Sequence, residues 1–371
     1  MKYDVVIIGA GPGGIAAAHN LINNNISCLL IDKQKFPRNK LCAGGITSKT
    51  FDLLKELKLK KEFTGENTII SEGAELYLEY KYITKIKSKG LTYMVDRFDF
   101  DSYLVDDYKD KGGILLEEAR VKNIDEKNNI ITLGNEETIE FQYIIGADGA
   151  VGMTRKLVDK NMHANGFCLQ VDVERSKFKY DTDYMSLYYG IIPQGYGWIF
   201  PKKSYLTIGF GGDYNKNFDY NGEFEKFLNK LGINCDRKDF KGAFLAFGEH
   251  IKNPVNKEKN LLLVGDAAGL VDPITGEGIY FAMLSGVKAS NLIIKAIKEN
   301  SPNEVDKYKY EIENITKNIG KGAKLKKPIY TFRKPIFNAM KNKKIGDFVF
   351  NECLYESNYC LLELLFHKNK M

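Results

Sequence analysis

The sequence lacks several features that would direct it to particular protein classes. No run of 18 apolar residues occurs, so we expect no transmembrane helix. The chain begins directly on an apolar strand pattern, so we expect no signal peptide. Cysteines stand at positions 28, 42, 168, 235, 353 and 360, with no C-x-x-C pair and no zinc-type spacing to histidine. We therefore expect no metal, a reducing compartment and a cytoplasmic location.

Internal repeats, low-complexity linkers and recognised nucleic-acid-binding modules are also missing. The net charge of +6 is modest for 371 residues, and we expect no nucleic-acid partner. A content of 44% hydrophobic and 27% charged residues is typical of a globular protein. The length exceeds that of one ordinary core, which predicts two domains or lobes.

The clearest positive signal lies near the N-terminus. Residues 5–8 are apolar and β-branched, as in a strand buried on both faces, and Gly9, Gly11 and Gly14 follow. In such a turn the first glycine permits the tight bend, the second lets a pyrophosphate approach the backbone, and the third lets helix and strand pack closely. A helix is expected at residues 15–23.

A second apolar strand, residues 26–31, ends on Asp32. Strand, glycine turn, helix, strand and acid together predict a dinucleotide site. The helix N-terminus would bind the phosphates, and Asp32 would accept hydrogen bonds from the adenosine ribose. The alternative is an ordinary glycine turn in an α/β sheet.

Periodicity and turn residues predict the other elements. Further helices are expected at residues 47–59 (with Thr47 or Ser48 as N-cap), 96–111, 218–231 and 279–299, with helical character from 301 onward. Further strands are expected at 68–95, 114–116, 120–125, 130–133, 138–141, 143–147, 166–212 and 261–264. This order predicts an α/β fold with a discontinuous Rossmann-type cofactor domain (1–65, 96–165 and 250–300). An antiparallel β-sheet substrate domain (66–95 and 166–249) is inserted in it, and a C-terminal helical region (301–371) follows.

Two more loops at strand ends carry aspartate: Asp148-Gly149, with Arg155 six residues beyond Gly149, and Gly265-Asp266. Taken singly, each aspartate could simply form a turn. In this order with the first fingerprint, the loops resemble the large family of FAD-dependent enzymes with the p-hydroxybenzoate hydroxylase fold. The resemblance covers about residues 1–300 and implies that the cofactor is FAD.

Four details are similar to one branch, the geranylgeranyl reductases. They are Lys40-x-Cys42-x-Gly44-Gly45, the stretch Tyr-Gly-Trp-Ile-Phe-Pro-Lys at 196–202, Gly269 where aromatic hydroxylases commonly have His, and Thr-Gly-Glu-Gly-Ile at 275–279. Ala43 departs from the glycine of many members, and the C-terminal region is short.

The resemblance implies a set of FAD contacts. Asp266 would bond the ribityl chain, Arg97 would pair with the phosphates, and Asp148 would brace the pyrophosphate region. The backbone at 276–278 would lie against the isoalloxazine, with the following helix dipole favouring the reduced flavin. The implied residues are Gly9, Gly11, Pro12, Gly13, Gly14, Asp32, Lys33, Cys42, Ala43, Gly44, Arg97, Val121, Asp148, Gly149, Gly265, Asp266, Gly276, Glu277, Gly278 and Ile279.

We hypothesise that the protein reduces isolated carbon–carbon double bonds of a prenyl lipid of the geranylgeranyl type. An external donor would reduce FAD, flavin N5 would deliver hydride to one alkene carbon, and a proton would reach the other. Cys42, Gly44 and Gly45 are the catalytic candidates. Cys42, beside basic residues, is interpreted as a proton donor, redox partner or substrate contact, or else as a packing residue.

Four aromatic residues are candidates to line an apolar tunnel for the substrate: Tyr188, Tyr196, Trp198 and Phe200. Each is equally explained as core. Lys202 and Arg38 either meet an anionic head group or are solvated surface charges. Residues 317–344 carry ten Lys or Arg and no acid, which fits either an anionic membrane surface or a solvated helical face.

Two other functions fit the same sequence. One is a flavin monooxygenase or halogenase on this scaffold, which the glycine at 269 and the Cys42 loop argue against. The other is an electron-transfer flavoprotein that donates to quinone or a partner protein through a docking face. Since FAD takes the one dinucleotide fingerprint, the electron donor is left open between NAD(P)H and a ferredoxin-like protein.

Overall fold

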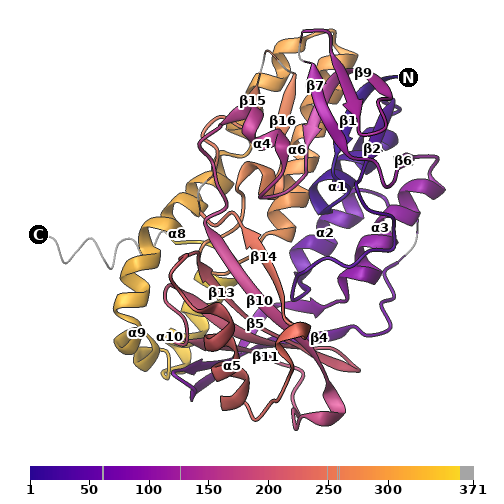
Figure 1. Ribbon diagram of the computed structural model, residues 1–371. Helices are drawn as coiled ribbons and strands as arrows, with labels where there is room; N and C mark the ends of the chain where they lie inside the picture. The colour runs from indigo at the N-terminus through magenta and orange to yellow at the C-terminus, as the bar shows by residue number, and fades with distance from the viewer. Residues whose placement is uncertain (61, 126, 249, 257, 259, 360–371) are drawn as a thin grey trace, which may run out of the picture.

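Two eight-stranded sheets organise the chain, which a computed structural model describes at residues 1–60, 62–125, 127–248, 250–256, 258 and 260–359. The first sheet lies in the upper lobe of Figure 1 and the second in the lower lobe. The yellow C-terminal helices lie along the left side of the lower lobe.

The first sheet is built around β1 (Lys2–Ile8), which pairs in parallel with β2 (Cys28–Ile31) and β9 (Thr138–Gly146). Val5, Val6 and Ile7 of β1 are 0% exposed. The sheet order is β15-β16-β9-β1-β2-β6, with β8 on β9 and β7 on β8. These remaining strands are β6 (Ile114–Leu116), β7 (Val121–Asp125), β8 (Ile130–Leu133), β15 (Val255–Asn256) and β16 (Leu261–Leu263).

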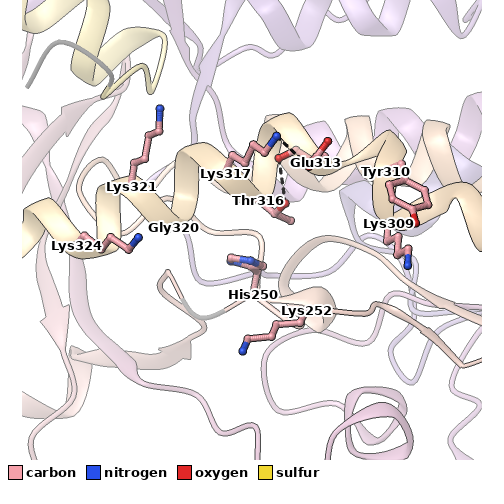
Figure 2. A pocket seen from close by; sticks show the side chains of 10 residues that line it. All are labelled: His250, Lys252, Lys309, Tyr310, Glu313, Thr316, Lys317, Gly320, Lys321 and Lys324. Atoms are coloured by element: carbon pink, nitrogen blue, oxygen red, sulfur yellow. Dashed lines mark hydrogen bonds and ion pairs between the residues drawn. The ribbon is translucent and has the colours of Figure 1, made fainter. Parts of the chain in front are cut away.

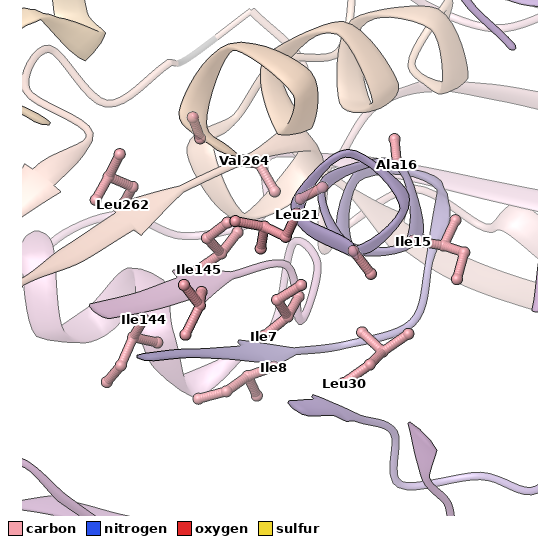
Figure 3. Packing of buried hydrophobic residues seen from close by; sticks show 14 of the residues in the cluster. Ile7, Ile8, Ile15, Ala16, Leu21, Leu30, Ile144, Ile145, Leu262 and Val264 are labelled. Atoms are coloured by element: carbon pink, nitrogen blue, oxygen red, sulfur yellow. The ribbon is translucent and has the colours of Figure 1, made fainter. Parts of the chain in front are cut away.

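Helices α1 (Pro12–Asn23) and α6 (Ile279–Lys298) pack together beside this sheet. Figure 3 shows Leu21 of α1 above Ile7, Ile144 and Ile145 of the sheet. α3 (Arg97–Asp110) packs against α1, and the short α4 (Met153–Val158) follows β9. The parallel pattern and buried first strand confirm the predicted Rossmann-type unit.

The second sheet has the order β14-β10-β13-β12-β11-β4-β5-β3. It is antiparallel except where β11 pairs in parallel with β4. Its strands are β3 (Gly45–Thr47), β4 (Ile69–Leu78), β5 (Lys81–Met94), β10 (Gly166–Glu174), β11 (Met185–Tyr189), β12 (Gly195–Pro201), β13 (Tyr205–Asp213) and β14 (Lys241–Leu245). Helix α5 (Tyr220–Lys230) packs on one face through Phe224, Phe227 and Leu228.

Three details differ from the sequence prediction. The strands expected at 138–141 and 143–147 form the single strand β9, because pairing with β1 continues from Glu140 to Gly146. Helix α2 (Ser48–Glu56) is shorter than expected, and its N-cap Thr47 makes no side-chain capping bond. β3 pairs with β5 in the second sheet, although the predicted division assigned residues 1–65 to the cofactor domain.

The C-terminal region is helical over most of its described residues, 301–359, as predicted, and residues 360–371 of the predicted region lie outside the described residues. It contains α7 (Tyr308–Glu311), α8 (Glu313–Thr331), α9 (Arg333–Ala339), α10 (Lys343–Phe348) and a π-helical turn (Val349–Tyr355). Among the described residues, no helix combines the length and apolarity needed to span a bilayer.

Candidate functional site

The three loops that carry the sequence fingerprints meet in space. A Cβ atom on Gly9 would lie 2.4 Å from the Ala147 carbonyl oxygen, so the first loop touches the second. A Cβ atom on Gly13 would lie 3.1 Å from Val264 Cγ2 and 3.0 Å from the Ala282 oxygen, so the first loop also touches the third. These contacts bring the three distant segments together, as the FAD contacts implied by the resemblance require.

Asp32 closes the first loop from the end of β2. Its Oδ2 accepts a hydrogen bond from Ala10 N (2.9 Å) and its Oδ1 from Gln34 N (2.9 Å). Ala119 N donates to the Asp32 carbonyl oxygen at 3.0 Å, which brings the start of β7, at Val121, toward the same edge. Lys33 is exposed beside it. Asp32 therefore holds the glycine loop in place through these backbone hydrogen bonds. A contact with a ribose would be a second role.

A buried network of charges lies next to this loop. Arg97 donates bidentately to Asp101, with both N···O distances 2.7 Å, and lies close enough to the Cys42 thiol for the two groups to interact electrostatically. Arg38 lies 3.3 Å from Asp101 and 3.7 Å from Asp32. Since Arg38 is only 7% exposed, the surface-charge interpretation of this residue was wrong.

Asp148 and Asp266 have different environments. Asp148 caps α4, accepting from Thr154 N (3.0 Å) and from the Thr154 hydroxyl. Asp266 lies near the cations Lys40, Arg97 and Arg155; burial raises its pKa and these cations oppose the rise. Burial correspondingly lowers the pKa of Lys40, and Asp266 opposes that change. The Asp266 carboxylate is thus held near three cations at the start of the third loop.

The turn at residues 275–278, called the flavin turn below for the role that the resemblance implies, is shaped by Asp272. The Asp272 carboxylate, 0% exposed, accepts from Ile274 N (2.9 Å) and Thr275 N (2.8 Å). Glu277 in the turn accepts from Thr47 Oγ1 (3.1 Å) and Lys49 Nζ (3.3 Å). Burial raises the pKa of Glu277, and Lys49 opposes the rise. Sequence reasoning missed Asp272, although its Asp-Pro pair is a turn signal.

Strand β12 runs from the flavin turn to the Cys42 loop. Tyr196 donates its hydroxyl to the Thr275 carbonyl oxygen. At the other end, a Cβ atom on Gly45 would lie 2.8 Å from the Phe200 ring, and Lys202 Nζ donates to the Ala43 oxygen at 2.7 Å. Because side chains alternate along a strand, Tyr196, Trp198, Phe200 and Lys202 share one face, called the front face below.

The structure divides the predicted tunnel residues between two faces. Trp198, with Tyr196 and Phe200 against it, belongs to a hydrophobic cluster that includes Leu41 and Ala43. Tyr188 lies in a different cluster under α5, stacked on Tyr77. Its β-sheet partner is Gly197, which also points to the rear face. The structure therefore does not place Tyr188 with the other three aromatics.

Lys202 is 1% exposed, so the surface-charge interpretation of this residue was also wrong. Burial lowers its pKa to about 8, while Cys42, Asp172 and Asp96 oppose the change. The Cys42 loop is partly exposed. It is fixed from two sides, because Val95 N donates to the Gly44 oxygen at 2.8 Å. Gly44 has φ +76°, which favours glycine there.

The residues fit an FAD molecule. A Cβ atom on Gly11 would meet nothing within 4 Å, which leaves open space at the start of α1 for a phosphate group. Within the described part of the chain, the buried Arg38 Nε has no hydrogen-bond partner and is a candidate donor to the cofactor. Asp266 supplies an acceptor at the third loop. No three metal-ligating side chains gather among the described residues.

Comparison with known proteins identifies the family. An FAD binding domain model matches residues 2–206, more than half of the chain. The digeranylgeranylglycerophospholipid reductase of Methanocaldococcus jannaschii is 32% identical over 326 residues, covering 83% of this chain and 81% of that protein.

Two crystal structures share the fold. A geranylgeranyl bacteriochlorophyll reductase-like protein from Thermoplasma acidophilum has a TM-score of 0.73 at 23% identity, covering 92% of this chain and 91% of that chain. The probable FAD-dependent monooxygenase pqsL from Pseudomonas aeruginosa also has a TM-score of 0.73, at 14% identity, covering 92% and 99%. The domain model and the sequence relative, rather than the fold alone, show that the chain belongs to the geranylgeranyl reductase family of FAD-dependent oxidoreductases.

Proposed function

We propose that this protein saturates carbon–carbon double bonds of a geranylgeranyl-type prenyl lipid. The observation that carries the proposal is the front face of β12, whose aromatic side chains connect the flavin turn with the Cys42 loop. The digeranylgeranylglycerophospholipid reductase among its relatives supports the same substrate class. When bound and reduced by the external electron donor, FAD would supply the hydride.

The front face would bind and orient the prenyl chain. Trp198, Tyr196 and Phe200 offer apolar surface, and burying a prenyl methylene against it gains about 0.8 kcal/mol. Glycines 209 and 211 of β13 stand beside Trp198 and Tyr196 in the sheet, so the aromatic rings are not crowded from that strand. Exclusion of water by these rings favours hydride transfer over side reactions.

Cys42 would supply the proton to the second alkene carbon. Its sulfur lies in a partly exposed loop, accepts a hydrogen bond from Gly44 N at 3.4 Å and lies near the Arg97 guanidinium. Gly44 and Gly45 allow this loop to lie directly on Val95 and Phe200. The proposal keeps the FAD contacts expected from the fingerprints. For Arg97 it adds that the guanidinium would bind the phosphates while still paired with Asp101.

The external electron donor and a membrane contact belong to the same proposal. A groove of about 610 Å³ lies between α8 and the loop at His250 and Lys252 (Figure 2). Of its described lining residues the one carboxylate, Glu313, pairs with Lys317 at 2.9 Å, while Lys252, Lys309 and Lys324 make no ion pair there. Ile251 N donates to the Ala268 oxygen, so the groove adjoins the third cofactor loop. An acidic donor protein fits this groove; NAD(P)H is the alternative.

The basic run at 317–344 is not uniform. Lys326 is buried on Asp213, and Arg333 pairs with Glu79 at 3.2 Å. Phe332, Ile345 and Phe348 are exposed next to the remaining lysines. This mixture would suit peripheral contact with an anionic membrane from the cytoplasmic side. Co-sedimentation with vesicles of anionic lipid, but not with neutral vesicles, is the expected result.

Anaerobic reduction followed by reoxidation tests the function directly. The purified yellow protein is reduced with light or dithionite and then mixed with geranylgeranyl lipids, quinones or oxygen. We expect prenyl lipid to reoxidise the flavin and to gain two hydrogens per saturated bond, measured by mass spectrometry. Reoxidation by quinone without lipid reduction would instead support an electron-transfer flavoprotein.

A monooxygenase is the second candidate, since pqsL shares the fold. It would consume oxygen in proportion to a hydroxylated product, with NADPH as donor. The lipid assay run in air separates the two, because a reductase loses electrons to oxygen without hydroxylating the lipid.

A further inference from the structure

The C-terminal segment reaches back to the residue that shapes the flavin turn. Tyr359 is 0% exposed and donates its hydroxyl to Asp272, with distances of 2.8 Å to both Oδ1 and Oδ2. Ile274 and Cys353 lie in the same hydrophobic cluster as Tyr359. A side chain near the end of the described chain is therefore locked beneath a loop of the cofactor site.

Asp272 passes this contact on to the flavin turn. Besides its two side-chain bonds to Ile274 N and Thr275 N, its carbonyl oxygen accepts from Gly276 N (3.0 Å) and its own N donates to the Glu277 oxygen (2.9 Å). A buried carboxylate that moves breaks several of these bonds at once. The orientation of Asp272 thus determines the path of the turn.

A second link joins the same segment to the turn. Lys49 Nζ donates to the Tyr355 carbonyl oxygen at 2.7 Å and to Glu277 Oε2 at 3.3 Å. Tyr355 lies at the end of the π-helical turn, four residues before Tyr359. Two separate contacts therefore connect residues 355–359 with Asp272, which precedes the flavin turn, and with Glu277 inside it.

We propose that residues 355–359 form a latch that positions the flavin turn, with Tyr359 as a positioning residue. The inference rests on the proposed assignment of residues 275–278 to FAD. Removing the Tyr359 hydroxyl leaves Asp272 with fewer donors and frees the turn to adopt other paths. FAD would then bind to a less ordered site, even though the substituted residue touches no part of it.

The test compares Tyr359→Phe with Tyr180→Phe in the full-length protein. The Tyr180 hydroxyl makes two hydrogen bonds, to the Tyr184 oxygen and to Ser186, and Tyr180→Phe removes both. Tyr180 lies away from the turn. We measure the FAD dissociation constant, the flavin absorption spectrum and amide hydrogen exchange of residues 274–278 in flavin-free protein. Both variants keep the ring, so folding is preserved, and a melting temperature is recorded for each.

We expect Tyr359→Phe to weaken FAD binding about tenfold, the loss from one buried hydrogen bond to a charged group, and to speed exchange in the turn. Tyr180→Phe should leave both within about twofold. A Tyr359→Phe protein with a lower melting temperature but unchanged FAD affinity and turn exchange would overturn the latch. Since these measurements need no prenyl substrate, failure of lipid reduction would refute the proposed function and leave the latch standing.

Discussion

The two faces of β12 and its neighbouring strands have opposite roles although their residues alternate along the same chain. On the rear face, Ile199, Phe210 and Tyr188 pack under α5 into a cluster closed by Phe224 and Phe227. On the front face, Trp198 Nε1 is buried and has no hydrogen-bond partner among the described residues, and Lys202 carries a buried charge. The rear face is covered by α5, whereas the front face keeps a buried indole nitrogen without a partner among the described residues, and we propose that a ligand completes this face.

The difference shows that period-2 alternation, rather than aromatic content, separates the core beneath α5 from the proposed substrate face in this sheet. Tyr188 and Tyr189 are adjacent tyrosines of β11. Tyr188 pairs with Gly197 and faces α5, while Tyr189 pairs with Tyr196 and faces the front. Variants on each face should therefore separate stability from catalysis.

The largest effect is expected on the rear face, from Phe210→Ala. Phe210 is 0% exposed and contacts the Phe224 ring edge-on at 5.1 Å. Loss of a buried phenylalanine typically costs about 3–5 kcal/mol of unfolding free energy. Chemical denaturation measures this loss, while turnover per FAD-loaded molecule should stay within about twofold of the wild type. A specific loss of turnover in stably folded protein would place the rear face in the site.

On the front face, Trp198→Ala should lower kcat/KM for the prenyl lipid by roughly 30- to 150-fold, because about 2–3 kcal/mol of apolar contact is lost. Steady-state kinetics with a geranylgeranyl lipid measures it. Tyr188→Phe is the matched rear-face control and should have wild-type kinetics. Equal losses in both variants would contradict the division between the faces.

Cys42→Ala should reduce lipid-dependent reoxidation of the flavin about 100-fold or more, the low end of the range for a positioned proton donor. Stopped-flow absorbance under anaerobic conditions measures the rate. Reduction of the flavin by dithionite should be unchanged, which controls for cofactor binding. If lipid-dependent reoxidation is unchanged, Cys42 is a packing residue and not the proton donor.

The smallest effect concerns Lys202 and pH. Burial lowers the pKa of Lys202 to about 8 from the ordinary value of 10.5. The folded chain then holds fewer protons than the unfolded chain between these values, so the contribution of this group to the unfolding free energy rises with pH across that window. Wild type should therefore gain stability relative to Lys202→Met from pH 8 to pH 10. Urea denaturation measures the unfolding free energy of both proteins at each pH. If the difference between them does not change with pH, burial does not destabilise the Lys202 ammonium.

Much of the cofactor lobe follows from local sequence. The apolar run into Gly9, Gly11 and Gly14, with Asp32 at the end of the next strand, specifies β1, α1 and β2 because each step has a short-range physical reason. The predicted fold class was confirmed for the same reason: crossover and alternating patterns are local. The convergence of the Asp148 and Asp266 loops on this unit was predicted from the resemblance.

The features that sequence analysis missed depend on contacts between residues far apart in the chain. The register of β11 against β12 decides that Tyr188 faces the rear, and nothing near Tyr188 announces this register. Lys202 and Arg38 resemble surface residues by type, and only the packed Cys42 loop and the Asp101 carboxylate explain their burial. The Tyr359–Asp272 bond joins residues 87 positions apart.

The close contact of α1 with α6 governs how this chain can be divided. A Cβ atom on Gly286 would lie 2.1 Å from the Gly13 oxygen, so the two backbones touch. A fragment ended at residue 206 would contain everything that the family domain model matches, yet would lack the partner of its first helix. On the ribosome, α1 must likewise wait for residue 286 to emerge before it acquires this neighbour. The cofactor lobe is therefore a late product of synthesis and not a module that can be excised from the N-terminal half.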